Sequence, residues 1–116
     1  MLKTLLGQSA EARAEVYLKQ QGLLPVARNW RCRFGEIDLI MRDRDTLVFV
    51  EVRLRNHRHF GDGFASVTAS KQHKLLAAAR QYLSTLKSLP PCRFDVVAMR
   101  DDATPDWLKN AFEDAG

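Results

Sequence analysis

Cysteine, proline and long apolar runs are all scarce in this 116-residue chain. The two cysteines, Cys32 and Cys92, have no metal-like spacing, so we expect free thiols in a reducing compartment rather than a disulfide framework. No apolar run approaches the roughly 20 residues of a membrane span, and the amino-terminal MLKTLLGQ has too few apolar residues for a secretory signal. These absences predict a cytoplasmic protein that does not enter the membrane.

The composition is that of a globular protein. Hydrophobic residues make up 46% of the chain, which excludes general disorder. A chain of this length buries roughly two thirds of its extended surface on folding. No repeat, low-complexity tract or long linker divides it, so we expect one domain over residues 1–116.

Acidic residues are sparse in most of the chain. Residues 1–94 contain 16 Lys or Arg against 8 Asp or Glu, whereas residues 95–116 contain 2 against 6. The segment 28–58 has eight arginines and no lysine, and guanidinium groups match phosphate oxygens well. This balance favours an anionic polymer as partner, and nucleic acid before a membrane surface, because no basic amphipathic helix is visible.

Residues 35–55 predict a hairpin of two strands joined by a polar turn at residues 43–45. Side chains alternate along a strand, so Glu36 and Asp38 share one face of the first strand, and Glu51 and Arg53 share one face of the second. The apolar residues expected on the opposite face of the first strand are Ile37, Leu39 and Met41.

Folding this hairpin about Arg44 brings Asp38 near Val50 and Glu51, within one residue of register. Two ionised carboxylates about 4 Å apart repel by roughly 4 kcal/mol near a protein surface, so a proton or a cation is expected between them. A few oxygen ligands suit Mg²⁺, which also binds substrate phosphate, and Arg53 lies on the same face to contact that phosphate. The alternative is a solvated hairpin face with mixed charges.

A helix is predicted over residues 6–21, with Gly22 as its stop, because Ala10, Ala14 and Leu18 recur every four positions. Glu11 lies beside this apolar stripe. It can lean over the sheet towards other carboxylates, or it is simply solvated.

The next segments are less regular. Residues 23–34 predict a connector with a short strand, in which Trp30 and Phe34 are core residues rather than stacking platforms for bases. Residues 56–65 predict a loop that contacts a substrate backbone. His57 and His59 in that loop lack further ligands at zinc spacing, so a zinc site is disfavoured.

A second helix is predicted over residues 70–87, capped by Thr68 or Ser70, with Lys71 and Lys74 in its first turns. Cations at a helix start oppose the helix dipole, which makes more sense if a phosphate binds there. The alternative, which this helix viewed alone slightly favours, is that both are ordinary surface lysines.

The carboxyl-terminal part predicts a strand over residues 93–99 and then a short helix. Asp95 stands near the start of the strand, and we expect it to pair with an arginine. The helix is expected to begin at residues 104–106, with Pro105 at its first position.

Five segments in fixed order carry a resemblance to a known family. They are Gly7…Glu11…Ala14…Tyr17-Leu18, GEIDLI (35–40), FVEVRLR (49–55), SKQHKL (70–75) and RFDVV (93–97). Over nearly its whole length the chain resembles the YraN family of small bacterial proteins, in the PD-(D/E)XK nuclease superfamily, with likeness to archaeal Holliday junction resolvases.

This resemblance implies a restriction-endonuclease-like α/β fold: a mixed sheet flanked by helices in α-β-β-β-α-β order. It implies that Mg²⁺ or Mn²⁺ binds to Glu11, Asp38 and Glu51, although Ile37 stands where the motif has proline. Gln72 would complete the pocket. Contacts to the nucleic-acid backbone are assigned to Arg55, His57, Arg58, Lys71 and Lys74. Resolvase-like relatives also imply a homodimer, since a four-way junction presents two equivalent strands.

Arg53 is the main departure from the superfamily pattern, which has lysine at this position. Arginine stays protonated in proteins and cannot act as a general base, but it can stabilise the charge of a phosphoryl transition state. We therefore expect a metal-dependent endonuclease-like protein acting on DNA, with branched or junction DNA as candidate substrates.

Two alternatives stay open. One is a nucleic-acid-binding protein on a catalytically inactive nuclease scaffold. Its binding to nucleic acid would be salt-sensitive and would survive, or even tighten, when Asp38 and Glu51 are neutralised. The other is a module that binds a protein partner. The absence of any DNA binding at low salt would favour this alternative.

Overall fold

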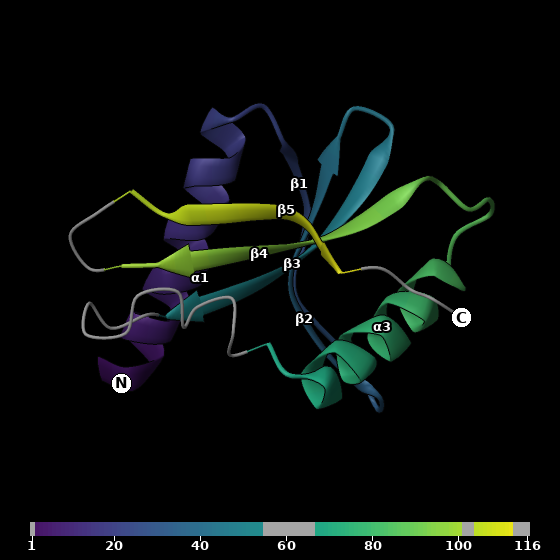
Figure 1. Ribbon diagram of the computed structural model, residues 1–116, viewed down its shortest axis with the longest axis horizontal. Helices are drawn as coiled ribbons and strands as arrows, with labels where there is room; N and C mark the ends of the chain where they lie inside the picture. The colour runs from purple at the N-terminus through teal and green to yellow at the C-terminus, as the bar shows by residue number, and fades with distance from the viewer. Residues whose placement is uncertain (1, 55–66, 101–103, 113–116) are drawn as a thin grey trace.

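The computed structural model describes residues 2–54, 67–100 and 104–112, with side chains described from residue 10 onward (Figure 1). No helix in this described part of the chain is long and apolar enough to cross a lipid bilayer. The elements, in chain order, are α1 (Leu2–Gln20), β1 (Leu24–Cys32), β2 (Gly35–Asp43), β3 (Thr46–Leu54), α3 (Ala69–Leu83), β4 (Cys92–Met99) and β5 (Asp106–Phe112).

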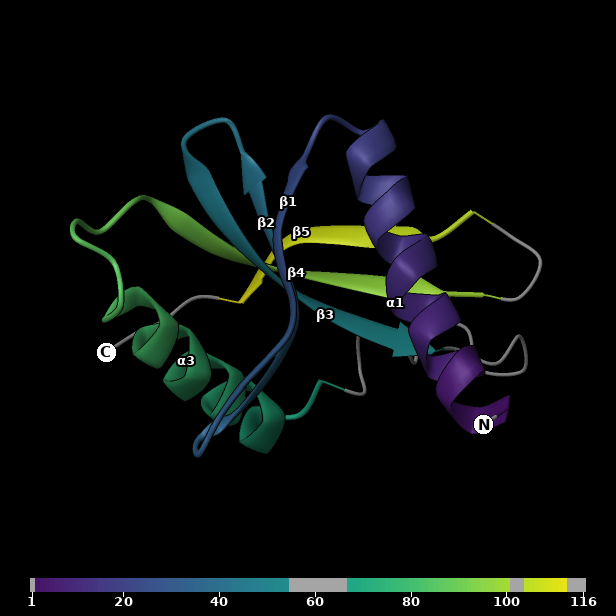
Figure 2. The ribbon, with the colours of Figure 1, turned by 180° about the vertical axis from the view of Figure 1, so that it is seen from behind.

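The strands form one five-stranded mixed sheet in the order β1-β2-β3-β4-β5. Strands β3 and β4 are parallel, and every other neighbouring pair is antiparallel. Parallel neighbours need a crossover, and α3 lies in the chain between them. The helices lie on different sides of the sheet (Figures 1 and 2). The expected mixed α/β sheet between helices is thereby confirmed. The expected short strand within residues 23–34 is a full edge strand, β1.

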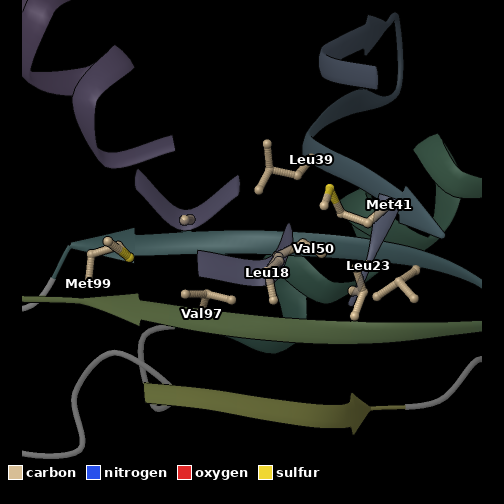
Figure 3. Packing of buried hydrophobic residues seen from close by; sticks show 9 residues of the cluster. Leu18, Leu23, Leu39, Met41, Val50, Val97 and Met99 are labelled. Carbon is tan, nitrogen blue, oxygen red and sulfur yellow. The ribbon is translucent and has the colours of Figure 1, made fainter. Parts of the chain in front are cut away.

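Helix α1 covers one face of the sheet through the predicted apolar stripe. Ala14 and Leu18 are fully buried and pack in one cluster with side chains from β2, β3 and β4. Figure 3 shows Leu18 among these strands. The strand residues of the cluster are Leu39, Met41, Val48, Val50, Val97 and Met99. Burying a side chain of this size stabilises the fold by about 1.5–3 kcal/mol.

The end of α1 has the hydrogen bonds of a Schellman motif. Gly22 adopts a left-handed φ of 101°, its N–H donates to Lys19 O at 3.0 Å, and the Leu23 N–H donates to Leu18 O at 3.0 Å. Leu18 and Leu23 also share the α1-side core. Gly22 is therefore the stop that the sequence predicts.

Helix α3 covers the other face. Leu75, Ala78 and Ala79 are buried against a second cluster that includes Phe49 and Phe94, whose rings stack 5.4 Å apart. The predicted cap is Thr68, which accepts a hydrogen bond from the Lys71 N–H at 3.3 Å. The helix ends at Leu83, four residues before the predicted end at residue 87.

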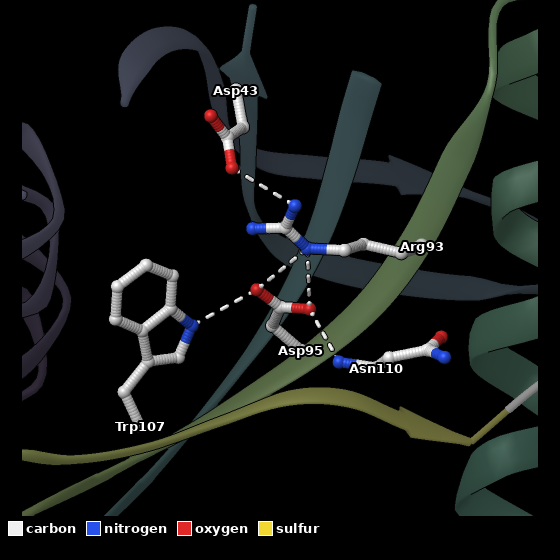
Figure 4. Close-up of polar contacts among 5 residues, drawn as sticks. All are labelled: Asp43, Arg93, Asp95, Trp107 and Asn110. Atoms are coloured by element: carbon white, nitrogen blue, oxygen red, sulfur yellow. Dashed lines mark hydrogen bonds and ion pairs between the residues drawn. The ribbon is translucent and has the colours of Figure 1, made fainter. Parts of the chain in front are cut away.

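The predicted carboxyl-terminal helix is wrong, because residues 106–112 form the edge strand β5. A helix of this length is marginal without tertiary support, whereas β4 offers a free edge with which β5 pairs. A buried network fixes the pairing (Figure 4). The fully buried Asp95 accepts hydrogen bonds from Trp107 Nε1 and from the Asn110 N–H, both at 2.9 Å. The expected arginine partner of Asp95 is confirmed as Arg93, whose Nε lies 3.1 Å from Oδ1.

One face assignment on β2 is also wrong. Leu39 and Met41 pack on the α1 side as a pair, but Ile37 packs on the α3 side. Figure 2 shows β2 curving strongly along its length. Regular alternation therefore fails between Ile37 and Leu39, with Asp38 between them.

Candidate functional site

The two strands of the predicted hairpin separate at the candidate site. Their ladder ends at the pair Leu39–Val50, and beyond it β2 pairs with β1 alone while β3 pairs with β4 alone. Figures 1 and 2 show the two strands diverging, and we call this divergence the fork. Asp38 and Glu51 are the first residues past the last pair, one on each strand, so the predicted proximity of these acids is confirmed.

At the fork, the Asp38 side chain takes the place of a backbone hydrogen-bond acceptor that β2 no longer offers to β3. The Val52 N–H donates to Asp38 Oδ2 at 2.8 Å, where a regular sheet would supply a backbone carbonyl. The Asp38 carboxyl also shares a hydrogen bond with Glu51, and burial together with Glu51 raises the pKa of Asp38 to about 8. The Val52 N–H and the Arg53 charge oppose this rise. Without a cation, we therefore expect the hydrogen-bonded Asp38–Glu51 pair to hold a proton at neutral pH.

Two hollows meet at the fork, and both are lined by Asp38 and Arg53. The α3-side hollow holds about 250 Å³ and is also lined by Gly35, Glu36, Glu51, Lys71, Lys74 and Leu75. The α1-side hollow holds about 310 Å³ and is also lined by Ala10, Glu11, Val52 and Leu54. The fork therefore opens towards both helices.

Glu11 approaches the fork from α1. Burial and the charge of Asp38 raise its pKa, with a smaller contribution from Glu36. A hydrogen bond from the Asn29 side chain and the charge of Arg28 lower that pKa. Of the two alternatives for Glu11, the structure shows the one that leans towards the other carboxylates.

Helix α3 brings cations to the same place. Lys71 and Lys74 line the α3-side hollow together with Asp38 and Glu51. Close packing fixes this end of the helix, since a Cβ added to Gly35 would lie 3.1 Å from the Lys74 carbonyl oxygen. A larger residue at position 35 would require the Lys74 backbone to shift by a few tenths of an ångström.

The remaining predicted residues divide into two groups. The Gln72 amide Nε2 donates to Val67 O at 3.0 Å, so this side chain stabilises the start of α3. Gln72 is not among the described residues that line the α3-side hollow, whereas its neighbour Lys71 is. Arg55, His57 and Arg58 lie outside the described residues.

Glu36 and Asn29 were not predicted as site residues. Glu36 lines the α3-side hollow and forms an ion pair of 3.4 Å with Arg31. Its position two residues before Asp38 was the available signal. Asn29 hydrogen-bonds Glu11, and the sequence offers no signal for this contact because it joins a helix to an edge strand.

The donor set fits a hard divalent cation in part. Asp38 and Glu51 are oxygen donors that share a hydrogen bond, and burial followed by the neighbouring Glu51 raises the pKa of Asp38, so a cation bound there would favour the ionised form of the pair. Among the described residues, no three Asp, Glu, His or Cys side chains are grouped closely enough to hold one ion. The fork thus offers an acid pair with Glu11 as a neighbour rather than a closed cage, a pattern that suits Mg²⁺ with several retained waters.

A larger hollow of about 560 Å³ lies away from the fork, between α1 and the segment that leads into β5. Its lining includes Val16, Tyr17 and Met99, and none of the described residues that line it is acidic. Size alone would favour this hollow as a binding site. The chemistry favours the fork, where acids with raised pKa values and cationic side chains converge.

Comparison with known proteins finds relatives that match most of the chain, including the residues of the fork. Residues 10–99 match the family described as "Uncharacterised protein family UPF0102". A UPF0102 protein of Nitrosospira multiformis is 53% identical over 115 residues, covering 97% of each chain. A UPF0102 protein of Cupriavidus metallidurans is 58% identical over 111 residues, covering 95% of this chain and 82% of its own. The chain therefore belongs to the uncharacterised protein family UPF0102.

Proposed function

We propose that this protein is a divalent-metal-dependent nuclease that acts on DNA phosphodiesters, with branched or junction DNA as the preferred substrate class. The observation that carries the proposal is the hydrogen-bonded acid pair Asp38–Glu51 at the fork, in one hollow with Arg53, Lys71 and Lys74. The resemblance to the YraN family, the PD-(D/E)XK superfamily and the archaeal junction resolvases supports the reaction class.

Asp38 and Glu51 would hold Mg²⁺ or Mn²⁺, with Glu11 as a third acid on the α1 side of the fork. A bound divalent ion lowers the pKa of water and neutralises charge on a phosphoryl oxygen. Asp38 must lose its proton to bind the ion, because a carboxylic acid is a poor ligand. The raised pKa of Asp38 thus couples metal binding to proton release.

The cationic side chains would bind the substrate. Arg53 lines both hollows at the fork and presents a guanidinium that can donate to two phosphate oxygens. It cannot accept a proton from water, so its role is to stabilise charge. Lys71 and Lys74 extend the positive surface along α3 and would contact the flanking backbone. A homodimer would offer one fork to each of the two equivalent strands of a junction.

A second candidate function is nucleic-acid binding on a catalytically inactive scaffold. The observation that favours it is Arg53, which stands where the superfamily has lysine and so removes one candidate general base. In this case Asp38→Asn and Glu51→Gln would leave DNA binding intact or tighten it, since each substitution removes negative charge from a site that faces phosphate.

Cleavage assays separate the two candidates. The purified protein is incubated with linear, nicked and four-way-junction DNA in Mg²⁺ or Mn²⁺, beside Asp38→Asn, Glu51→Gln and the matched control Asp45→Asn. Asp45 is an exposed acid in the β2–β3 turn, so its substitution makes the same charge change away from the fork. We expect wild type and Asp45→Asn to cut, and the two fork variants to lose about 100-fold or more in rate. Binding by all four proteins without cleavage would replace the nuclease with the second candidate.

A further inference from the structure

Two aromatic side chains were expected in the core near the turn between β1 and β2, and only one of them is there. Trp30 packs against the α3-side core, with its ring centroid 5.4 Å from that of Tyr82. Phe34 lies in the turn itself and is 42% exposed, so its assignment to the core is wrong. The other large apolar side chains that are exposed in the described part of the chain are all aliphatic. Phe34 is therefore the only exposed ring among the described residues.

Cationic side chains lie next to this ring. The guanidinium carbon of Arg33 is 4.8 Å from the centroid of Phe34, which is the distance of a cation–π contact. The Arg31 side chain is 74% exposed and forms an ion pair of 3.4 Å with Glu36. An exposed ring offers a stacking face, and guanidinium groups beside it offer donors to phosphate oxygens. Together they have the chemistry of a contact to nucleic acid.

The turn is packed against the start of α3, on the side of the fork where the lysines lie. Figures 1 and 2 both show the β1–β2 turn beside this helix. A Cβ added to Gly35 would lie 3.1 Å from the Lys74 carbonyl oxygen, and both residues line the α3-side hollow. Asp38 follows Phe34 by four residues, which is about 13 Å of extended strand. This length corresponds to roughly four base steps of a DNA strand, so the ring and the fork can contact neighbouring nucleotides.

A phenylalanine ring can recognise only one feature of DNA well. It has no hydrogen-bond donor or acceptor, so it cannot read the polar edges of the bases, but it can stack on the flat face of any base. In a continuous duplex these faces are covered by the neighbouring base pairs. They become accessible at a branch point, at an end or where a base is unpaired.

We propose that Phe34 stacks on an exposed base face of the DNA substrate, while Arg31 and Arg33 bind the adjacent phosphates. The inference rests on the part of the proposed function that names DNA as the ligand, and it applies whether or not the protein cuts that DNA. It makes Phe34 the residue that determines specificity for branched over continuous DNA. Because Phe34 would contact the substrate away from the phosphate at the fork, it is not a catalytic residue.

The test measures binding without divalent metal, so that no cleavage can occur. The probes are a four-way junction with 2-aminopurine at the branch point and a continuous duplex with the sequence of two of its arms. Fluorescence anisotropy gives both affinities for wild type, Phe34→Leu and Phe34→Trp. The matched control is Leu24→Ala, which trims another exposed apolar side chain at the far end of β1. Thermal unfolding confirms that each variant is folded.

We expect wild type, Phe34→Trp and Leu24→Ala to bind the junction more tightly than the duplex. Phe34→Leu keeps an apolar side chain but has no ring, so it should lose about 10-fold in junction affinity and keep its duplex affinity. Stacking should also quench 2-aminopurine in the wild-type complex, and less so with Phe34→Leu.

Three results would overturn the inference and leave the proposed function standing. They are equal junction affinity of wild type and Phe34→Leu, an equal loss in Leu24→Ala, and a loss in Phe34→Leu that is the same for junction and duplex. If wild type binds neither DNA, the proposed function itself fails and the inference fails with it.

Discussion

Two aspartates of the sheet, Asp95 and Asp38, have contrasting hydrogen-bond partners. Asp95 on β4 is fully buried and accepts hydrogen bonds from a guanidinium, an indole and a backbone N–H. Asp38 on β2 accepts one backbone N–H, and its other hydrogen-bonding partner is the carboxyl of Glu51. The first carboxylate is surrounded by donors, and the second stands beside another acid.

This difference distinguishes a carboxylate that stabilises the fold from one that is a candidate for binding a ligand. A buried carboxylate with enough donors links strands, and the Asp95 network joins β4 to β5 and, through Arg93 and Asp43 at 2.9 Å, to the end of β2. A buried acid pair in which one pKa is strongly raised is unfavourable for folding when both groups ionise. Acids with perturbed pKa values cluster at functional sites, which supports the proposed cation site at the fork.

The same substitution should have opposite effects at the two positions. Asp95→Asn removes the negative charge beside Arg93 and leaves that partly buried guanidinium with Asp43 as its acidic partner. We expect the free energy of unfolding to fall by about 3 kcal/mol or more. Urea denaturation at pH 7 measures it, with Asp45→Asn as control. A loss below about 1 kcal/mol would show that the Asp95 network contributes little to the fold.

Asp38→Asn should instead stabilise the protein at neutral pH. In the unfolded chain Asp38 ionises near 3.8, but in the folded protein its pKa is about 8, so between these values the folded state holds one more proton. Raising the pH therefore favours unfolding, by about 1.4 kcal/mol for each pH unit from this group. Asparagine mimics the protonated acid, accepts from the Val52 N–H and removes this dependence.

The measurement is the difference in unfolding free energy between Asp38→Asn and wild type, taken from pH 5 to pH 8 without divalent metal. We expect the difference to grow with pH. A constant difference would mean that Asp38 is already ionised in the folded protein, and the contrast with Asp95 would then disappear.

The affinity for a divalent metal should depend on the same ionisation of Asp38. Because Asp38 must deprotonate to bind a cation, Mn²⁺ affinity should rise up to about tenfold per pH unit from pH 6.5 to 8 and level off above the pKa of about 8. Calorimetry in two buffers of different ionisation enthalpy counts the protons released. A flat affinity with no proton release would exclude Asp38 as a ligand.

The smallest expected effects concern the lysines of α3. Lys71→Ala and Lys74→Ala should each weaken DNA binding and lower the slope of log affinity against log salt by about 1. Lys87→Ala is the matched control, because Lys87 is exposed beyond the far end of α3. Equal slopes for the three variants would place the DNA elsewhere.

The hairpin and its register were predictable because the information is local. Alternation set the strands, the short polar turn set their pairing, and these two facts placed Asp38 beside Glu51. The helix end at Gly22 was likewise encoded by a residue that tolerates a left-handed backbone.

The errors have a common physical origin in contacts between distant segments. Residues 106–112 became a strand because β4 offers an edge and Asp95 offers an acceptor to β5. Ile37 changed sides because β2 bends where it leaves β3. The Asn29–Glu11 contact joins residues whose proximity only the folded sheet creates.

Mn²⁺ calorimetry at pH 8.5 tests the central claim most directly, on wild type, Asp38→Asn, Glu51→Gln and Asp45→Asn. The proposal of a cation held by Asp38 and Glu51 predicts saturable binding by wild type and Asp45→Asn, and at least a tenfold loss of affinity in both fork variants. No binding by wild type, or equal affinity in all four proteins, would contradict it.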